Sequence, residues 1–149
     1  MRIDKKLIFG LLLAPLAGVS YMAGAESLGK GTMTPTEEIV FEPFAPGMPL
    51  QIAKLWGDRT QGAYGMLLKI PPGFEAGFHA HTADYYALNM QGTWVHTMDG
   101  VSKVLPVGSY VMQPGGQFHN DVCKGPDDCI LFIHQDAKGD FIPAPAKKE

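Results

Sequence analysis

The sequence has few basic residues and no cluster of them. Its 149 residues include 12 Lys and Arg against 15 Asp and Glu, a formal net charge of −3 at pH 7. Loss of residues 1–25, argued below, would remove three basic residues and one acidic one and bring this charge of −3 to −5. Because polyanions are bound through basic patches, the composition excludes nucleic acid and anionic lipid as partners.

Sustained helical periodicity is also missing. No long segment repeats its apolar residues at helical spacing, and 18 glycines and 12 prolines would interrupt helices repeatedly. Short β-type runs separated by turn residues are present instead, at a spacing typical of sandwiches and barrels. The sequence therefore predicts an all-β fold of about eight to ten strands.

Turn signals bound the expected strands. Pro71-Pro72-Gly73 and Pro114-Gly115-Gly116 each end such a run, and Asp99-Gly100 is typical of a hairpin. Residues 137–149 are polar, contain Pro and Ala, and are expected to form a tail. The predicted strands are residues 52–56, 64–70, 78–81, 85–98, 101–105, 110–113 and 130–135.

A long apolar run occurs once, near the N-terminus. Basic residues precede an apolar stretch over residues 7–23, and Ala23-Gly24-Ala25 offers a small-x-small cleavage site. These features predict a secretory signal peptide over residues 1–25, and Pro15 within the apolar stretch favours cleavage over permanent anchoring. We therefore expect export to the periplasm or the extracellular space, with no membrane segment left after cleavage.

Only two cysteines are present, Cys123 and Cys129. In an exported protein, two cysteines that flank a short loop are expected to form a disulfide bond. The chain-entropy model gives a loop this short roughly 2–2.5 kcal/mol of stabilisation. A pair of thiolate metal ligands or a redox pair is the less favoured alternative, because the spacing is not C-x-x-C.

Histidine is sparse as well, but two of the five histidines form His79-Ala80-His81. Side chains two positions apart on a strand share a face, with Cα atoms roughly 6.5–7 Å apart, so both imidazoles can reach one ion. On a helix they would diverge. His119 can supply a third imidazole from a distant strand. His96 and His134 lack such spacing and are expected to be structural or surface residues.

Two motifs in this region resemble those of the cupin superfamily. The first reads Gly73, five residues, His79, one residue, His81 and later Gly92. The second reads Gly108, five residues, Pro114, one residue, Gly116, two residues, His119. The resemblance covers residues 73–119 and implies a cupin double-stranded β-helix, a jelly-roll-type barrel with metal in its mouth. It also implies metal ligands at His79, His81 and His119, and turns at Gly92 and Gly116.

The chain departs from the family pattern at two positions. Tyr85 stands where the first motif usually has glutamate, and Cys123 stands where the second usually has asparagine. Three alternatives for the fourth ligand follow. Asp84 can supply a carboxylate if the strand bulges by one residue, Tyr85 can coordinate or donate a proton, or the site has three histidines and open positions. The last alternative, with Tyr85 nearby as a catalytic group, is favoured.

The resemblance implies a single cupin domain over residues 37–143, between a flexible leader at 26–36 and a polar tail at 144–149. Its expected cofactor is one divalent transition metal: Zn, Fe, Mn, Ni or Cu. The predicted function is a metalloenzyme for a small organic molecule, with dioxygenase, isomerase and hydrolase chemistry all open. One alternative is a non-catalytic module that binds a metal or a small ligand. Another is a barrel without metal. Separately, pairing of edge strands between two copies would allow a homodimer.

Overall fold

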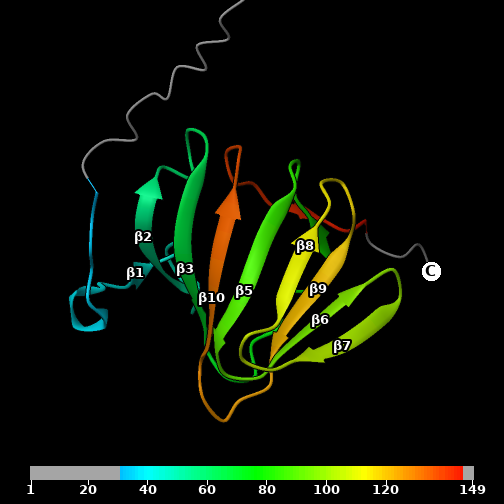
Figure 1. Cartoon of the computed structure of the whole chain (residues 1–149). Coiled ribbons are helices and arrows are strands. Elements are labelled where there is room, and N and C mark those ends of the chain that lie inside the picture. The colour runs from blue at the N-terminus through cyan, green and yellow to red at the C-terminus, as the bar shows by residue number, and fades with distance from the viewer. Residues whose placement is uncertain (1–30, 146–149) are drawn as a thin grey trace, which may run out of the picture. The chain divides into compact units, whose positions relative to one another are not determined.

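The computed structural model describes residues 31–145 (Figure 1). The predicted signal peptide, residues 26–30 of the predicted leader and residues 146–149 lie outside the described part. The unit that begins at Thr34 contains the strands. Among residues 31–145, no helix combines the length and the hydropathy that a membrane span requires.

The larger sheet has six antiparallel strands in the order β1-β2-β3-β10-β5-β8. Figure 1 shows its long strands side by side, with β10 at the centre although it comes late in the chain. The strands are β1 (Glu42–Pro43), β2 (Gln51–Gly57), β3 (Tyr64–Ile70), β5 (Tyr85–Gln91), β8 (Tyr110–Gln113) and β10 (Cys129–Gln135).

The smaller sheet has five antiparallel strands in the order β11-β4-β9-β6-β7. A single 3-10 turn, η1 (Thr36–Glu38), precedes all the strands in the described chain. The prediction of an all-β fold is confirmed. The strands of this sheet are β4 (His79–Ala80), β6 (Trp94–Met98), β7 (Val101–Leu105), β9 (His119–Cys123) and β11 (Ile142–Pro143).

The strand pattern predicts one strand over residues 85–98, which is wrong, whereas the turn that the cupin resemblance implies at Gly92 is present. The chain turns at Gly92, whose φ is +80°, and divides into β5 of the larger sheet and β6 of the smaller one. A Cβ atom at this position would lie 2.6 Å from the carbonyl oxygen of Asp128, so only glycine fits. The turn at Gly92 is therefore the point at which the chain passes from one sheet to the other.

The Asp99-Gly100 hairpin is confirmed. Both residues have positive φ, 52° and 72°, and they connect β6 to β7 as a two-residue loop between the paired residues Met98 and Val101. The expectation of an unpaired tail after Gln135 is wrong in part, because β11 pairs with β4. This pairing returns the end of the described chain to the strand that carries His79.

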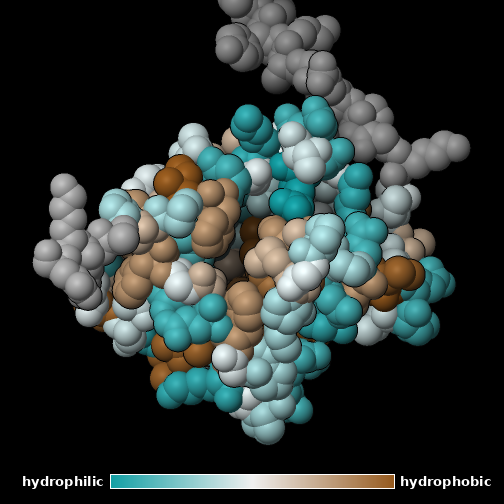
Figure 2. All heavy atoms as spheres, turned by 180° about the vertical axis from the view of Figure 1, so that it is seen from behind, coloured by the Kyte–Doolittle hydropathy of each residue, from teal (hydrophilic) through white to brown (hydrophobic). Residues whose placement is uncertain are grey.

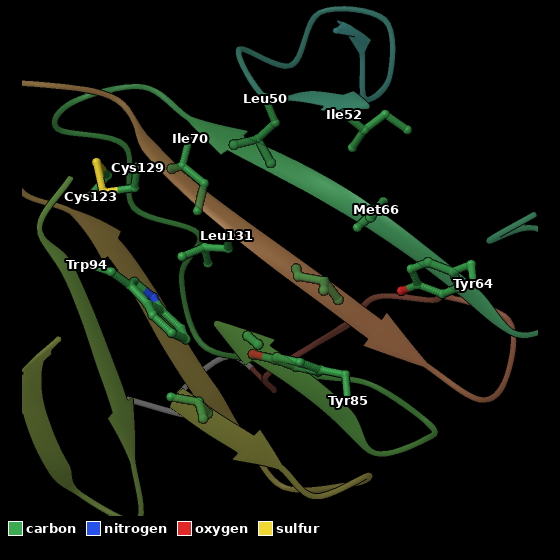
Figure 3. Close-up of a cluster of buried hydrophobic side chains, with 13 residues drawn as sticks. Leu50, Ile52, Tyr64, Met66, Ile70, Tyr85, Trp94, Cys123, Cys129 and Leu131 are labelled. Carbon is green, nitrogen blue, oxygen red and sulfur yellow. A yellow bond between two sulfur atoms is a disulfide. The ribbon is translucent and has the colours of Figure 1, made fainter. Parts of the chain in front are cut away.

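The core lies between the two sheets, and β10 shows how it is built. Every second residue of β10 is buried: Cys129, Leu131, Ile133 and Gln135. This alternation is typical of a strand with one face on the core. Residues of both sheets join the cluster, including Trp94, which has no exposed surface (Figure 3).

The Cys123–Cys129 disulfide bond is present. Cys123 ends β9 in the smaller sheet and Cys129 begins β10 in the larger sheet, so the bond joins the two sheets as well as the ends of a loop. Both residues are fully buried. Figure 3 places the disulfide beside Ile70, Leu131 and Trp94, at the apolar end of the core.

Candidate metal centre

Three histidines meet where β4 and β9 pair. His79 lies directly opposite His119 in the antiparallel register, and His81 follows just after β4. The ring centroids lie 4.2 Å apart for His79 and His119, 5.0 Å for His79 and His81, and 5.3 Å for His81 and His119. One potential ligand atom from each residue lies within 4.8 Å of the other two. The tertiary structure thus gathers the three imidazoles that the sequence singles out.

A backbone carbonyl orients each of these rings. Nδ1 of every histidine faces a carbonyl oxygen, which accepts a hydrogen bond from the Nδ1 proton. A neutral imidazole carries only one proton, so Nε2 keeps its lone pair free to bind a metal. Contacts of this kind orient the histidine ligands of metal sites. The distances are 2.8 Å from His79 to Gly77, 2.5 Å from His81 to Asp140 and 3.3 Å from His119 to Gln117.

Burial keeps the imidazoles of His119 and His81 neutral. It is the main cause that lowers the pKa of His119 to about 4, against the opposing charge of Asp121. Burial likewise lowers the pKa of His81, against its hydrogen bond to the backbone of Asp140. Only a neutral imidazole has a lone pair for a metal, so at neutral pH protons compete weakly for these two rings.

Tyr85 lies next to the cluster on β5. Its side chain is buried, and its hydroxyl oxygen lies 3.2 Å from Nε2 of His119. Without a metal the hydroxyl can donate to this nitrogen, and a bound metal would take the lone pair instead. Burial, and then the charge of Asp121, raises the pKa of Tyr85 well above its ordinary value. The side chain is therefore a neutral hydroxyl beside the histidines and not a phenolate.

Asp84 does not lie with the histidines. Its side chain is exposed, and its Oδ1 accepts a hydrogen bond of 2.7 Å from the backbone N–H of Gly115. The bulge that would turn Asp84 inward is absent, because Tyr85 takes the buried position at the start of β5. Asp84 instead holds the Pro-Gly-Gly turn that precedes His119. The alternative in which Asp84 is a metal ligand is wrong on this geometry.

Asp121 is a site residue that the sequence analysis missed. It follows His119 by two positions on β9, the same spacing that relates His79 to His81. Its Oδ2 lies 3.5 Å from Nε2 of His119. Its Oδ1 accepts hydrogen bonds from Trp94 Nε1 at 2.7 Å and from His96 Nδ1 at 2.8 Å. The period of two along β9 is the signal that could have identified it.

The carboxylate of Asp121 is held in its charged form. Burial by itself would raise its pKa, but the hydrogen bond and charge of His96, the charge of His119 and the hydrogen bond of Trp94 outweigh it and lower the pKa. His96 also contacts Gln113 Oε1 at 3.1 Å through its other ring nitrogen. His96 is thus a structural residue that positions Asp121, as expected of a histidine outside the motifs.

Two further residues reach the site from the segment expected to be a tail. The carbonyl of Asp140 accepts the hydrogen bond from His81 described above. The ring of Phe141 stacks on the ring of His79, with centroids 4.4 Å apart and planes 16° from parallel. No pattern in residues 137–149 predicts these contacts, because they depend on the pairing of β11 with β4.

A cavity of about 150 Å³ opens beside the histidines. His79, His81, Tyr85 and Asp121 form part of its wall, and most of the remaining wall is apolar. Figure 2 shows a recess with hydrophobic residues around it on the face turned away from the view of Figure 1. The apolar lining includes Leu50, Met66, Leu68, Ile70, Phe74 and Leu131.

A protein family model described as a domain of unknown function (DUF4437) matches residues 45–148. No curated protein matches the chain. The family match spans the strands of both sheets from β2 onward, and therefore includes all three histidines and Asp121.

Solved structures match over most of their own length. An RmlC-like cupin from Ralstonia eutropha has a TM-score of 0.64 and 23% identity, covering 80% of this chain and 76% of that chain. The polyketide cyclase RemF from Streptomyces resistomycificus has a TM-score of 0.66 and 13% identity, covering 80% and 89% respectively. KdgF from Halomonas sp. has a TM-score of 0.59 and 18% identity, covering 70% and 94%. At these identities the likeness shows the fold, a cupin double-stranded β-helix.

Proposed function

The chain belongs to the DUF4437 family, and from this premise and the geometry of its histidines we propose that it is a metal-binding cupin. His79, His81 and His119 would hold one divalent transition metal ion. The observation that carries the proposal is the pattern of hydrogen bonds around the cluster. Three Nδ1 protons are directed to backbone carbonyls, which leaves three Nε2 lone pairs, and the cluster offers its ligand atoms within 4.8 Å of one another.

The donor set fits such an ion. Neutral imidazoles suit Zn, Fe, Ni and Cu, and three of them leave coordination positions for water or a ligand. A metal bound there would supply Lewis acidity toward an oxygen atom placed in an open position. Asp121 would add a negative charge close to the ion, since its free Oδ2 lies 3.5 Å from Nε2 of His119.

We further propose that the protein is an enzyme for a small organic molecule. The cavity places such a molecule against two groups that can hold or move a proton. The Tyr85 hydroxyl can donate a hydrogen bond, and Asp121 Oδ2 can accept one. By its name, RemF is an enzyme on the same fold, a polyketide cyclase. Dioxygenase, isomerase and hydrolase chemistry all fit this set of groups.

Export is part of the proposal. A disulfide bond that joins two sheets forms and persists in oxidising compartments, and the N-terminal sequence has the features of a signal peptide. Expression of the full chain with its natural N-terminus tests this. Mass spectrometry of the exported fraction is expected to find a chain that begins at Glu26, with no free thiol.

Metal analysis tests the central proposal. Protein purified without added metal is expected to contain about one equivalent of a transition metal in total, and His79→Ala/His119→Ala is expected to contain none. The matched control is His134→Ala, because His134 is also partly buried on a strand but contacts Trp56 and Asp136 and not the cluster. A double variant that still held one equivalent would show that the ligand set is wrong. A loaded protein without turnover would favour a non-catalytic binding module.

A further inference from the structure

The cavity beside the histidines is polar on the histidine side and apolar on the other, and this difference limits which ligands it can hold. We propose that it takes a neutral molecule with one ring, or an aliphatic body of similar size, that carries a hydroxyl group at the end facing the histidines. Phenols, enols and cyclic alcohols belong to this class. The inference deepens the proposed function by naming the ligand class of the same site. Asp121 carries the argument for the hydroxyl end, and the cavity alone carries the argument for the ring.

The size and lining of the cavity set the body of the ligand. The volume is about 150 Å³, and apolar cavities of roughly 150 Å³ accept one benzene-sized ring. The apolar wall consists of leucine, isoleucine, methionine and phenylalanine side chains on β3, on β10 and in connecting segments. A sugar or other polyol would bury several hydroxyl groups against this wall without partners, which is unfavourable.

Asp121 sets the polar end. Its Oδ1 already accepts two hydrogen bonds, from Trp94 and His96, so Oδ2 is the atom left to accept one from a ligand. An acceptor requires a donor, and a hydroxyl group provides one. A carboxylate in the same place would bring two negative charges together in a buried site.

The basic residue on the wall does not reverse this preference. Arg59 is the single Lys or Arg among the described residues that line the cavity. Its guanidinium donates to the carbonyl of Phe44 at 3.3 Å and lies 4.1 Å above the Phe44 ring. Asp140 also lines the cavity, so the one guanidinium is accompanied by two carboxylates. Without a bound metal the wall therefore carries more negative than positive charge and favours a neutral ligand over an anion.

Four probes test the class: phenol, toluene, benzoate and myo-inositol, each titrated by calorimetry into metal-free protein, where no bound cation attracts benzoate. Phenol is expected to bind at least about tenfold more tightly than benzoate and than toluene, and myo-inositol is expected not to bind. In Asp121→Asn the preference for phenol over benzoate is expected to shrink, because the repelling charge is gone. Benzoate or myo-inositol binding more tightly than phenol would overturn the inference.

Filling the cavity tests where the ring lies. Leu68 lines the cavity, whereas Leu88 lies on β5 with 40% of its surface exposed and outside the cavity lining. Leu68→Trp is expected to weaken phenol binding at least about tenfold, with Leu88→Trp unchanged and both still holding zinc. Leu68→Phe replaces Leu68→Trp if the larger side chain prevents folding. Phenol binding that neither Leu68→Trp nor Leu68→Phe weakens would place the ring outside this cavity and overturn the inference.

Zinc content separates this inference from the proposed function. Wild-type protein that binds no zinc would contradict the proposed function alone, because the four probes are compared in metal-free protein. Zinc bound by a protein that prefers benzoate in its metal-free form would contradict the inference alone. Metal-free protein that binds no phenol would overturn the inference, whatever its zinc content.

Discussion

The two ends of the barrel interior are built from the same strands but differ in what they contain. β9 begins at His119 in the histidine cluster and ends at Cys123 in the disulfide. β10 runs the opposite way along the core, from Cys129 at the apolar end to Gln135, which lines the cavity with the histidines. Figure 3 shows the disulfide and Trp94 at one end, Tyr64 and Tyr85 toward the other, and Leu131 between them.

The difference separates stability from binding. Apolar burial and a cross-link stabilise the fold at the disulfide end, whereas the histidine end buries polar groups that must find hydrogen-bond partners. The structure supplies those partners from backbone carbonyls for the three clustered histidines, from Asp121 and Gln113 for His96, and from Tyr85 for His119. If the comparison holds, changes at the disulfide end lower the free energy of unfolding, and changes at the histidine end lower metal affinity.

The largest expected effect on stability comes from Leu131→Ala. Leu131 is 2% exposed on β10 between the two ends, where it also lines the cavity, and its truncation enlarges the empty space between the sheets. The free energy of unfolding should fall by about 2–5 kcal/mol, measured by urea denaturation, while the metal content stays at one equivalent. Leu88→Ala, on an exposed face, is the control and should change stability by less than about 0.5 kcal/mol. Loss of metal in Leu131→Ala would break the separation of the two ends.

Removal of the disulfide comes next. In Cys123→Ser/Cys129→Ser the unfolded chain regains the freedom of a short loop, so stability should fall by roughly 2–2.5 kcal/mol. The metal content should not change, because β9 holds His119 at its opposite end. Thermal denaturation and metal analysis of the same sample give both values. A variant as stable as wild type would mean that sheet packing alone holds this end together.

Asp121→Asn changes the histidine end. The amide keeps an oxygen that can accept a hydrogen bond from Trp94 but removes the negative charge beside His119 Nε2. Metal affinity should fall by about 10–100-fold, with a small effect on stability, measured by competition with a chromophoric chelator. Asp84→Asn is the matched control, since Asp84 is exposed and binds only the Gly115 backbone N–H. Equal effects of the two changes would show that Asp121 acts on the fold and not on the ion.

Lowering the pH is expected to change the free energy of unfolding most gradually. The pKa of His119 is about 4 in the folded protein, whereas an unfolded histidine titrates near pH ~6.5. Between these values the unfolded chain binds more protons, so the stability of metal-free protein should fall as the pH drops from about 6.5 to about 4. Because the pKa of His81 is lowered too, His119→Gln should reduce this slope without abolishing it. His134→Gln is the control. If the dependence of unfolding free energy on pH were unchanged in His119→Gln, His119 would not be its source.

Local spacing made the centre of the site predictable. Two histidines with one residue between them on a strand share a face whatever the rest of the fold, and the Pro-Gly-Gly turn marks where His119 begins its strand. The same rule applies to His119 and Asp121. Asp121 was missed because an aspartate two positions after a histidine is common, and its significance appears only when Trp94 and His96 are seen to bond to it.

The contributions of Gly92, Asp140 and Phe141 could not be inferred from spacing alone. The run of β-forming residues on both sides of Gly92 predicts one strand, and only the closeness of Asp128 shows why a side chain there is excluded. Asp140 and Phe141 lie in a polar segment without periodicity. They reach the histidines because β11 adds to the free edge of β4, a pairing between segments about 60 residues apart in sequence.

The sequence by itself determined the all-β class, the disulfide pair and the shared face of His79 and His81, since each depends on composition or on neighbours a few positions away. The third imidazole, His119, came from the resemblance of its motif. The tertiary structure decided which of the remaining groups join those imidazoles: it brought Asp121 and Tyr85 inward, left Asp84 in solvent and returned the C-terminal segment to the site. The physical reason is that an unpaired strand edge and a buried charge each require a partner, and only the packed sheets show which partner is within reach.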